Sequence, residues 1–166
     1  MNIIDNAMPQ SEFVLAQRTF FERNIPWFYE ESQTHELSDD SYFWHCMYGK
    51  PEEGQDAIGQ PCSEAFPLFF PLLQRLECNS LINMRANLLI NRGPKKSIPH
   101  VDRFSSDMSH KTAIFYMNTC NGKTVIDGTE VDSVENRLVT FPSDTMHYVI
   151  HQTDEDRRIV ININYY

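Results

Sequence analysis

The second half of the chain limits the fold most strongly, because residues 81–166 consist almost entirely of short segments with β-strand character. Eight stretches rich in Ile, Val, Thr, Phe and Tyr follow one another, with turn signals between them. Asp127-Gly128 between two of these stretches is a strong hairpin signal. The expected strands are 81–91, 97–101, 111–118, 123–127, 129–134, 137–141, 146–151 and 157–165. So many short strands at this spacing predict a closed barrel or a jelly-roll sandwich.

The first half of the chain, residues 1–80, mixes helical signals with irregular, proline-bearing segments. An amphipathic helix is expected over 11–22, where apolar side chains form one stripe. A second helix is expected within 63–78, and its two prolines require a late start or a kink. The aromatic run 42–48 is a further strand candidate. We therefore expect a single, mainly β domain in which N-terminal helices form a support layer for the strand-rich half.

The composition narrows the class of partner. The chain has 166 residues and a net charge of −9, and an acidic chain repels phosphate backbones, so nucleic acid is a disfavoured partner. No apolar run approaches the length of a membrane span, and the N-terminus lacks the pattern of a secretion signal. The four cysteines fit no zinc-finger spacing. These features favour a cytoplasmic protein with reduced thiols.

Two side chains of the metal-ligand type lie close together near the expected start of the barrel. His100 and Asp102 are two residues apart, so at a strand end both side chains point to one face. If the segments 97–101 and 146–151 pair, His147 completes a three-point face. Two imidazoles and one carboxylate on one face leave open positions on an octahedral metal. This is the ligand set of non-haem iron(II) oxygenases, in which the open positions take a chelating co-substrate and dioxygen.

The His-x-Asp pattern is short and arises often by chance, and the alternative is that both residues are solvated parts of a loop. The context favours a metal site. The pattern lies near the start of the strand-rich half, His147 follows a Phe141-Pro142 turn, and a basic residue follows on the last strand. His151 has the same strand parity as His147 but does not directly follow that turn, and it ranks below His147.

The basic residue on the last strand is Arg157 or Arg158. A co-substrate with a distal carboxylate needs a guanidinium deep in the barrel, because arginine binds a carboxylate in a bidentate manner. Arg157 shares a strand face with three isoleucines, whereas Arg158 shares the other face with Asn162 and Asn164. A polar face suits the inside of a barrel that holds a ligand, which favours Arg158. The alternative is a pair of surface arginines at a strand start.

Two further residues are candidates for binding a co-substrate. Asn87 on the strand 81–91 can face the barrel interior, although a polar residue of an edge strand is an equal alternative. Tyr116 on the strand 111–118 can present its hydroxyl group to a carboxylate, and Asn118 has the same parity. His110 ends a polar stretch and is expected to be exposed to solvent.

In this order the motifs resemble the iron(II)/2-oxoglutarate-dependent oxygenases, on their prolyl-hydroxylase-like branch, over about residues 81–166. The matching elements are His100-x-Asp102, the run 112–118 followed by 121–124, Phe141-Pro142 through His147, and Arg158. The resemblance implies a double-stranded β-helix, that is, a jelly-roll or cupin-like core. It also implies iron(II) on the triad and 2-oxoglutarate that chelates the iron and places its distal carboxylate on the arginine. The reaction of the family consumes dioxygen and releases succinate and carbon dioxide.

The sequence departs from the family pattern in two places. Asn121-Gly122 stands where related chains often have a Gly-Gly turn. The step from His147 to the arginine is eleven residues for Arg158 (158 − 147), one more than the commonest pattern, which would select Arg157. The resemblance leaves the substrate open between a protein side chain, commonly proline, and a small molecule. The alternative function is a cupin-like module that binds a metal or small ligand without oxidative turnover. A jelly roll with no functional site is the third alternative.

Overall fold

Two antiparallel sheets lie face to face in the computed structural model, which describes residues 1–22, 25–31, 41–49, 59–102 and 110–166. The larger sheet has eight strands in the order β1-β9-β6-β11-β5-β3-β2, with β4 paired to β3. Its strands are β1 (Asn2–Ile4), β2 (Phe28–Glu30), β3 (Tyr42–Gly49), β4 (Gln60–Pro61), β5 (Leu81–Ile90), β6 (Lys111–Tyr116), β9 (Leu138–Pro142) and β11 (Arg157–Tyr165). The smaller sheet has the order β10-β7-β8, formed by His147–Ile150, Cys120–Ile126 and Thr129–Ser133.

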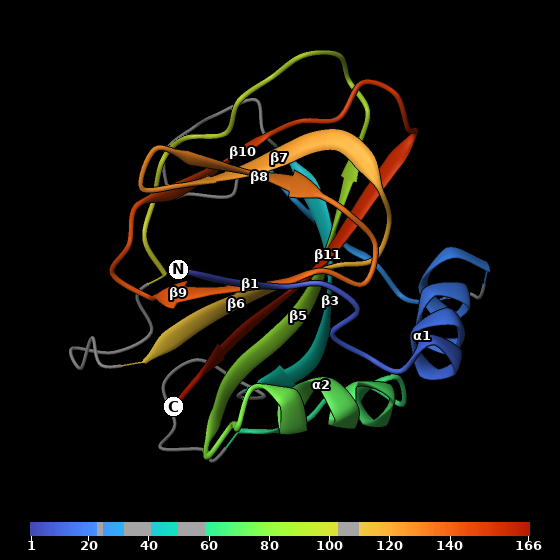
Figure 1. Ribbon diagram of the computed structural model, residues 1–166. Helices are drawn as coiled ribbons and strands as arrows, with labels where there is room; N and C mark the ends of the chain where they lie inside the picture. Colours follow the sequence, from blue (N-terminus) through green and yellow to red (C-terminus); the bar gives the residue numbers. More distant parts are fainter. Residues whose placement is uncertain (23–24, 32–40, 50–58, 103–109) are drawn as a thin grey trace.

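The helices cover the face of the large sheet that points away from the small one (Figure 1). They are α1 (Gln10–Glu22), the 3-10 helix η1 (Phe66–Phe69) and α2 (Phe70–Arg75). Both expected helices are therefore present. The second starts late and is split, because a proline occupies the first turn of each part, where its missing N–H group costs nothing. Aromatic side chains join this layer to the sheet, as in the edge-to-face contact of Phe13 with Phe115.

The central strand β11 separates two cores by the alternation of its side chains. Ile159, Ile161 and Ile163 belong to the apolar core beneath the helices. Their neighbours, from Arg158 to Asn164, point toward the small sheet, where Val160 packs in a second apolar cluster with residues of β6, β7, β8 and β9. Every residue of β11 after Arg157 is buried. The layer between the two sheets can therefore hold polar side chains out of contact with bulk water.

The eight expected strands correspond to seven named strands and one irregular segment. The expectation of a strand at 97–101 is wrong, because this segment makes only isolated bridges, from Lys96 to Ile150 and from His100 to His147. Its pairing with the segment 146–151 is nevertheless confirmed by the same bridges. The predicted hairpin turn is also confirmed, since Asp127 and Gly128 have φ angles of 48° and 77° between β7 and β8.

Two features of the sheets were not expected from the sequence. The short strands β1, β2 and β4 extend the large sheet, so residues 1–80 add strands as well as a helical layer. Asn121-Gly122 lies inside β7, next to a shift in the register with β8. Among the described residues, no helix is long and apolar enough to cross a membrane. The architecture is a mainly β double-stranded β-helix, or jelly roll, with N-terminal helices on one side.

Candidate metal centre

The three predicted metal ligands lie together at one end of the layer between the sheets. His147 is the first residue of β10, and its backbone exchanges two hydrogen bonds of 2.9 Å with that of His100. The centroids of the two imidazole rings are 4.5 Å apart, and the ring planes are tilted by 53° to each other. Asp102 follows two residues after His100, and its Oδ1 lies 3.8 Å from Nε2 of His147. One ligand atom from each residue lies within 4.8 Å of the others, which is close enough for one ion to contact all three.

Both histidines are held in the same tautomer by the same local device. Nδ1 of His100 lies 3.0 Å from the carbonyl oxygen of Ile98, and Nδ1 of His147 lies 3.0 Å from that of Thr145. A carbonyl oxygen can only accept a hydrogen bond, so each Nδ1 carries the proton. Each Nε2 therefore keeps a free lone pair, which a metal ion requires.

Asp102 divides its two oxygens between the protein and the open side of the site. Its Oδ2 accepts hydrogen bonds of 3.0 Å from the Thr112 hydroxyl and from the Asn164 amide, and a longer one of 3.5 Å from Asn162. The other oxygen, Oδ1, faces the histidines. The hydrogen bonds to Oδ2 fix the carboxylate so that Oδ1 is directed at the place where a metal ion would bind. Residues behind the ligands orient them in the same way in known metal sites.

The electrostatics favour the ligand forms of these residues. Burial alone raises the pKa of Asp102, but His147, the Asn164 amide, His100 and Thr112 together outweigh it, so its pKa lies below the ordinary value. Burial lowers the pKa of His147, and the opposing attraction of Asp102 does not cancel this effect. At neutral pH the site therefore presents a carboxylate and an unprotonated imidazole, the forms that bind a cation.

A narrow cavity of about 50 Å³ leads from the histidines to Arg158, which is enough space for a few water molecules. Its walls come from both sheets: Asn87, Leu89, His100, Ile114, Thr124, His147, Val149, Arg158, Val160 and Asn162. The amide oxygens of Asn87 and Asn162 are buried here and have no hydrogen-bond partner among the described residues. Such atoms indicate a polar ligand with hydrogen-bond donors, or water.

Arg158 is a buried cation that only neutral groups surround. Its side chain donates to Oγ of Ser133 at 3.2 Å and to Oγ1 of Thr124 at 3.0 Å, with a longer contact to the Lys123 carbonyl oxygen at 3.4 Å. No described carboxylate forms an ion pair with it. Burial accordingly lowers the pKa of the guanidinium group. A buried charge without a counter-charge is costly, and a bound carboxylate would relieve that cost.

Of the remaining predicted residues, Tyr116 and Asn87 lie beside Arg158 or the cavity, and Arg157 and Asn118 do not. Arg157 is exposed on the helical side, where its guanidinium stacks over Phe21 at 5.1 Å, far from the arrangement expected of a buried clamp. Tyr116 is fully buried beside Arg158, and its hydroxyl donates to Thr124 at 2.9 Å. Asn87 lines the cavity. Asn118 instead bonds to the backbone of β11, so the expectation that it could line the site is wrong.

Two other histidines, His110 and His151, lie outside the predicted triad. The expectation that His110 is exposed is wrong, because it is buried and its Nε2 lies 3.2 Å from the carbonyl oxygen of Asp102. His151 is buried too, but it lines a different hollow together with Lys95 and Lys96. His147 is therefore the histidine of this segment that joins His100 and Asp102.

The structure shows why only the second residue of the Asn121-Gly122 pair must be glycine. A Cβ atom at this position would lie 3.0 Å from the Gln152 nitrogen and 3.2 Å from Cδ of Arg158. Close approach of β7 to the Arg158 side chain therefore requires glycine here, whereas Asn121 before it is bonded to Asp154 and Thr153 at the surface. The glycine belongs to the packing of Arg158, and no turn is present.

Several residues that position the site were not identified from the sequence. Thr112 and Asn164 hold Asp102, and Ser133 and Thr124 hold Arg158. Strand alternation could have suggested Thr112 and Asn164, which are cross-strand partners on β6 and β11. Ser133 and Thr124 belong to the opposite sheet, and no spacing along the chain relates them to Arg158.

Asn164→Ala is expected to weaken binding of a divalent metal by about 10- to 100-fold, because Asp102 loses one of its two short hydrogen bonds and its orientation. Isothermal titration calorimetry with Mn2+ measures the change. Asn79→Ala, at an exposed position on the helical side, is the matched control and should leave the affinity unchanged. Equal affinities of the wild type and Asn164→Ala would show that Asn164 does not support a metal ligand.

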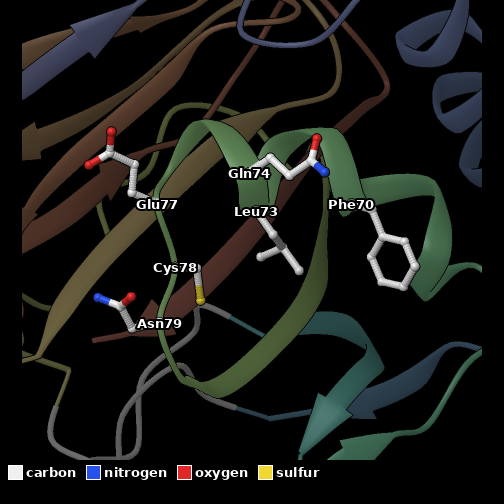
Figure 2. Close-up of a pocket in the computed structure, with 6 residues that line it drawn as sticks. All are labelled: Phe70, Leu73, Gln74, Glu77, Cys78 and Asn79. Carbon is white, nitrogen blue, oxygen red and sulfur yellow. The ribbon is translucent and has the colours of Figure 1, made fainter.

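Other hollows of the surface lie apart from these residues. Figure 2 shows one beside α2, which is lined by Phe70, Leu73, Gln74, Glu77, Cys78 and Asn79. It contains none of the residues predicted for the site. The candidate site is therefore the smaller cavity between the sheets, where the ligand-type side chains converge.

Comparison with known proteins shows similarity in structure. No protein-family model and no curated protein sequence matches the chain. A prolyl hydroxylase from Trichoplax adhaerens, solved with a peptide fragment of the hypoxia inducible factor oxygen degradation domain, has a TM-score of 0.68 and 15% identity. The match covers 99% of this chain and 82% of that one. An oxidoreductase of the 2OG-Fe(II) oxygenase family from Burkholderia pseudomallei has a TM-score of 0.71 and 10% identity, over 98% and 84% of the two chains.

A third similar structure is the epimerase SnoN in complex with Fe3+, α-ketoglutarate and nogalamycin RO. It has a TM-score of 0.64 and 13% identity, and the match covers 98% of this chain and 77% of that one. These identities are low, so the likeness concerns the fold. Almost the whole chain takes part in each match, including the N-terminal helices. The chain therefore has the fold of the prolyl hydroxylases and other 2-oxoglutarate- and iron(II)-dependent oxygenases.

Proposed function

We propose that this protein is an oxygenase that uses iron(II), 2-oxoglutarate and dioxygen. His100 and His147 through Nε2 and Asp102 through Oδ1 would hold the iron, and Arg158 would bind the distal carboxylate of 2-oxoglutarate. The observation that carries the proposal is Arg158, a buried guanidinium with only neutral partners at the far end of the cavity that starts at the histidines. A cupin-like module that only binds a metal has no need of such a buried cation.

The protein's own groups would act mainly by positioning. The Asp102 carboxylate and the two imidazoles would hold the metal from one side, so positions toward the cavity would stay open for ligands. Thr124 accepts hydrogen bonds from both the Arg158 guanidinium and the Tyr116 hydroxyl, so Tyr116 would help to position Thr124 while Arg158 would supply the donors to a carboxylate. Leu89, Val149 and Val160 in the cavity wall limit the access of water.

Iron and 2-oxoglutarate, when bound, would supply an oxidation in which dioxygen converts 2-oxoglutarate to succinate and carbon dioxide and inserts its second oxygen atom into a substrate C–H bond. The fold is shared by a prolyl hydroxylase in complex with a peptide and by an epimerase in complex with nogalamycin RO. We therefore propose that the substrate is either a protein residue, of the prolyl type, or a small molecule. A cytoplasmic location, with reduced iron and thiols, suits this chemistry.

The test is to add iron(II) and then 2-oxoglutarate to the protein in the absence of oxygen. We expect a visible charge-transfer band that needs both components, and succinate once air is admitted. Chelation by EDTA should remove both signals. If no band develops and no succinate forms, the protein is not a 2-oxoglutarate oxygenase. If the protein binds the metal but does not bind added 2-oxoglutarate, the result supports the cupin-like module instead.

A further inference from the structure

A polar row of the large sheet continues from the candidate metal ligands toward the sheet edge. Asn162, which contacts Oδ2 of Asp102, is the cross-strand partner of Arg85 on β5. Arg85 is in turn the partner of Cys46 on β3. Met84 and Ala86, which flank Arg85, belong to the core beneath the helices. Alternation therefore places Arg85 on the same face of the sheet as Asn162, toward the metal ligands.

The guanidinium of Arg85 is available to a ligand. The side chain is half-buried, and no described carboxylate lies within ion-pair distance of it. Its charge acts on its neighbour: burial and the Cys62 thiol raise the pKa of Cys46 to about 12, and Arg85 opposes that rise. Beside it, the buried amide oxygen of Asn162, in a side chain that is 9% exposed, lacks a partner among the described residues. Arg85 therefore offers hydrogen-bond donors on the strand next to this acceptor.

An aromatic surface adjoins Arg85 on the same face. Trp44 is the cross-strand partner of Asn87, and Phe28 is the partner of Trp44 on the edge strand β2. The Phe28 and Trp44 rings are 5.2 Å apart and tilted by 35°. Phe28 is 54% exposed, so its ring is accessible to a ligand in solution. The two rings and Arg85 form a surface with one cation and one flat apolar area.

Arg85 is distinct from the proposed co-substrate clamp. Arg158 pairs with Leu89 and is 1% exposed at the end of the narrow cavity, whereas Arg85 pairs with Asn162 and is half-buried. The net charge of −9 cannot attract anions to the surface in general. Any preference for an anion must therefore come from a local cation within the screening length of the solution, about 10 Å.

We propose that Arg85 binds a carboxylate group of the primary substrate, while Trp44 and Phe28 contact its flat apolar part. The substrate class is then a carboxylate-bearing molecule whose anionic group binds about one strand spacing, ~5 Å, beyond Asn162. The inference rests on the proposed function, because it takes the metal ligands as the place of oxidation. It assigns the two unpaired arginines of this face to two different carboxylates.

Binding of matched probes tests the charge preference. The protein is loaded with Zn2+ and 2-oxoglutarate, which prevents turnover, and its affinities for phenylacetate, phenylacetamide and benzylphosphonate are measured by ligand-observed NMR titration. We expect phenylacetate to bind about tenfold more tightly than the amide, as a charge-assisted hydrogen bond provides. Arg85→Gln should reduce this ratio to about one. Arg75→Gln, which removes the same charge from the exposed end of α2, should preserve it.

Each other outcome overturns the proposal. Equal binding of acid and amide, no binding of either, or a ratio that survives Arg85→Gln would show that Arg85 does not bind the substrate carboxylate. Tighter binding of benzylphosphonate than of phenylacetate would assign the surface to phosphoryl groups and contradict the carboxylate assignment.

A metal-free measurement separates this failure from failure of the proposed function. In a Trp27→Phe background, the fluorescence of Trp44 is quenched by iodide, an anion, and by neutral acrylamide. We expect Arg85→Gln to reduce quenching by iodide about twofold while quenching by acrylamide stays the same, because only the anion is concentrated by the guanidinium charge. Unchanged iodide quenching overturns the Arg85 inference whatever the metal site does. If the wild-type protein binds no Zn2+ or no 2-oxoglutarate but the iodide effect is as expected, the proposed function is overturned and the inference about the Arg85 charge is not.

Discussion

Asp102→Ala is expected to abolish iron binding and, with it, the formation of succinate. The carboxylate supplies the only anionic ligand of the described triad, and its Oδ1 is directed at the two histidines by hydrogen bonds to Oδ2. Loss of a metal ligand should lower the iron affinity more than loss of a residue that only orients a ligand, such as Asn164. We therefore expect the iron affinity to fall by more than about 100-fold. Anaerobic titration followed by the charge-transfer band measures binding, and succinate formed in air measures turnover.

Two further variants separate the role of the charge from that of the packing around it. Asp102→Asn keeps an oxygen that can accept from Thr112 and Asn164, so the fold should survive while the metal loses its anionic ligand. Asp144→Ala removes an exposed carboxylate on the segment before β10 and should leave iron binding intact. Wild-type turnover in Asp102→Ala would contradict the assignment of Asp102 as a ligand.

The site was predictable from the sequence to the extent that it depends on strand alternation. Alternation places Arg158 between the sheets and Arg157 on the helical face, and that is where the structure has them. Pairing of the segments 97–101 and 146–151 was the condition for His147 to join His100 and Asp102, and the bridge from His100 to His147 meets that condition. The functional roles of these residues stay predictions, which the variants proposed here test.

The rest of the site depends on the way in which the two sheets stack. Thr124 and Ser133 reach Arg158 from the opposite sheet, and strand alternation within one sheet does not indicate which side chains of the other sheet meet it. His110 was expected to be exposed because its sequence neighbours are polar, yet the fold buries it against the backbone of Asp102. The segment around His100 has strand composition but forms single bridges, and the Val149 N–H group donates to the Ser97 hydroxyl instead of to a backbone carbonyl of this segment.

Arg158→Ala is expected to weaken the binding of 2-oxoglutarate by about 100-fold and to change the iron affinity by less than about threefold. The guanidinium would contribute two charge-assisted hydrogen bonds to the distal carboxylate, and it does not touch the ligand triad. Anaerobic titration of the metal-free protein with iron(II) gives the iron affinity, and titration of the iron-loaded protein with 2-oxoglutarate under nitrogen gives the 2-oxoglutarate affinity. Arg157→Ala, at the exposed neighbouring position, should bind 2-oxoglutarate as the wild type does. If Arg157→Ala loses 2-oxoglutarate and Arg158→Ala does not, the clamp is Arg157.

Arg158→Met distinguishes a ligand clamp from a structural arginine. Burial disfavours the guanidinium charge, as the lowered pKa of Arg158 indicates, and no described carboxylate compensates it. An apolar side chain of similar length removes that cost, although it gives up hydrogen bonds to Ser133 and Thr124. We therefore expect the apoprotein of this variant to unfold at a temperature no lower than the wild type, while 2-oxoglutarate raises the unfolding temperature of the wild type alone. A structural arginine would show the opposite pattern, with a lower unfolding temperature in Arg158→Met and an unchanged response to 2-oxoglutarate.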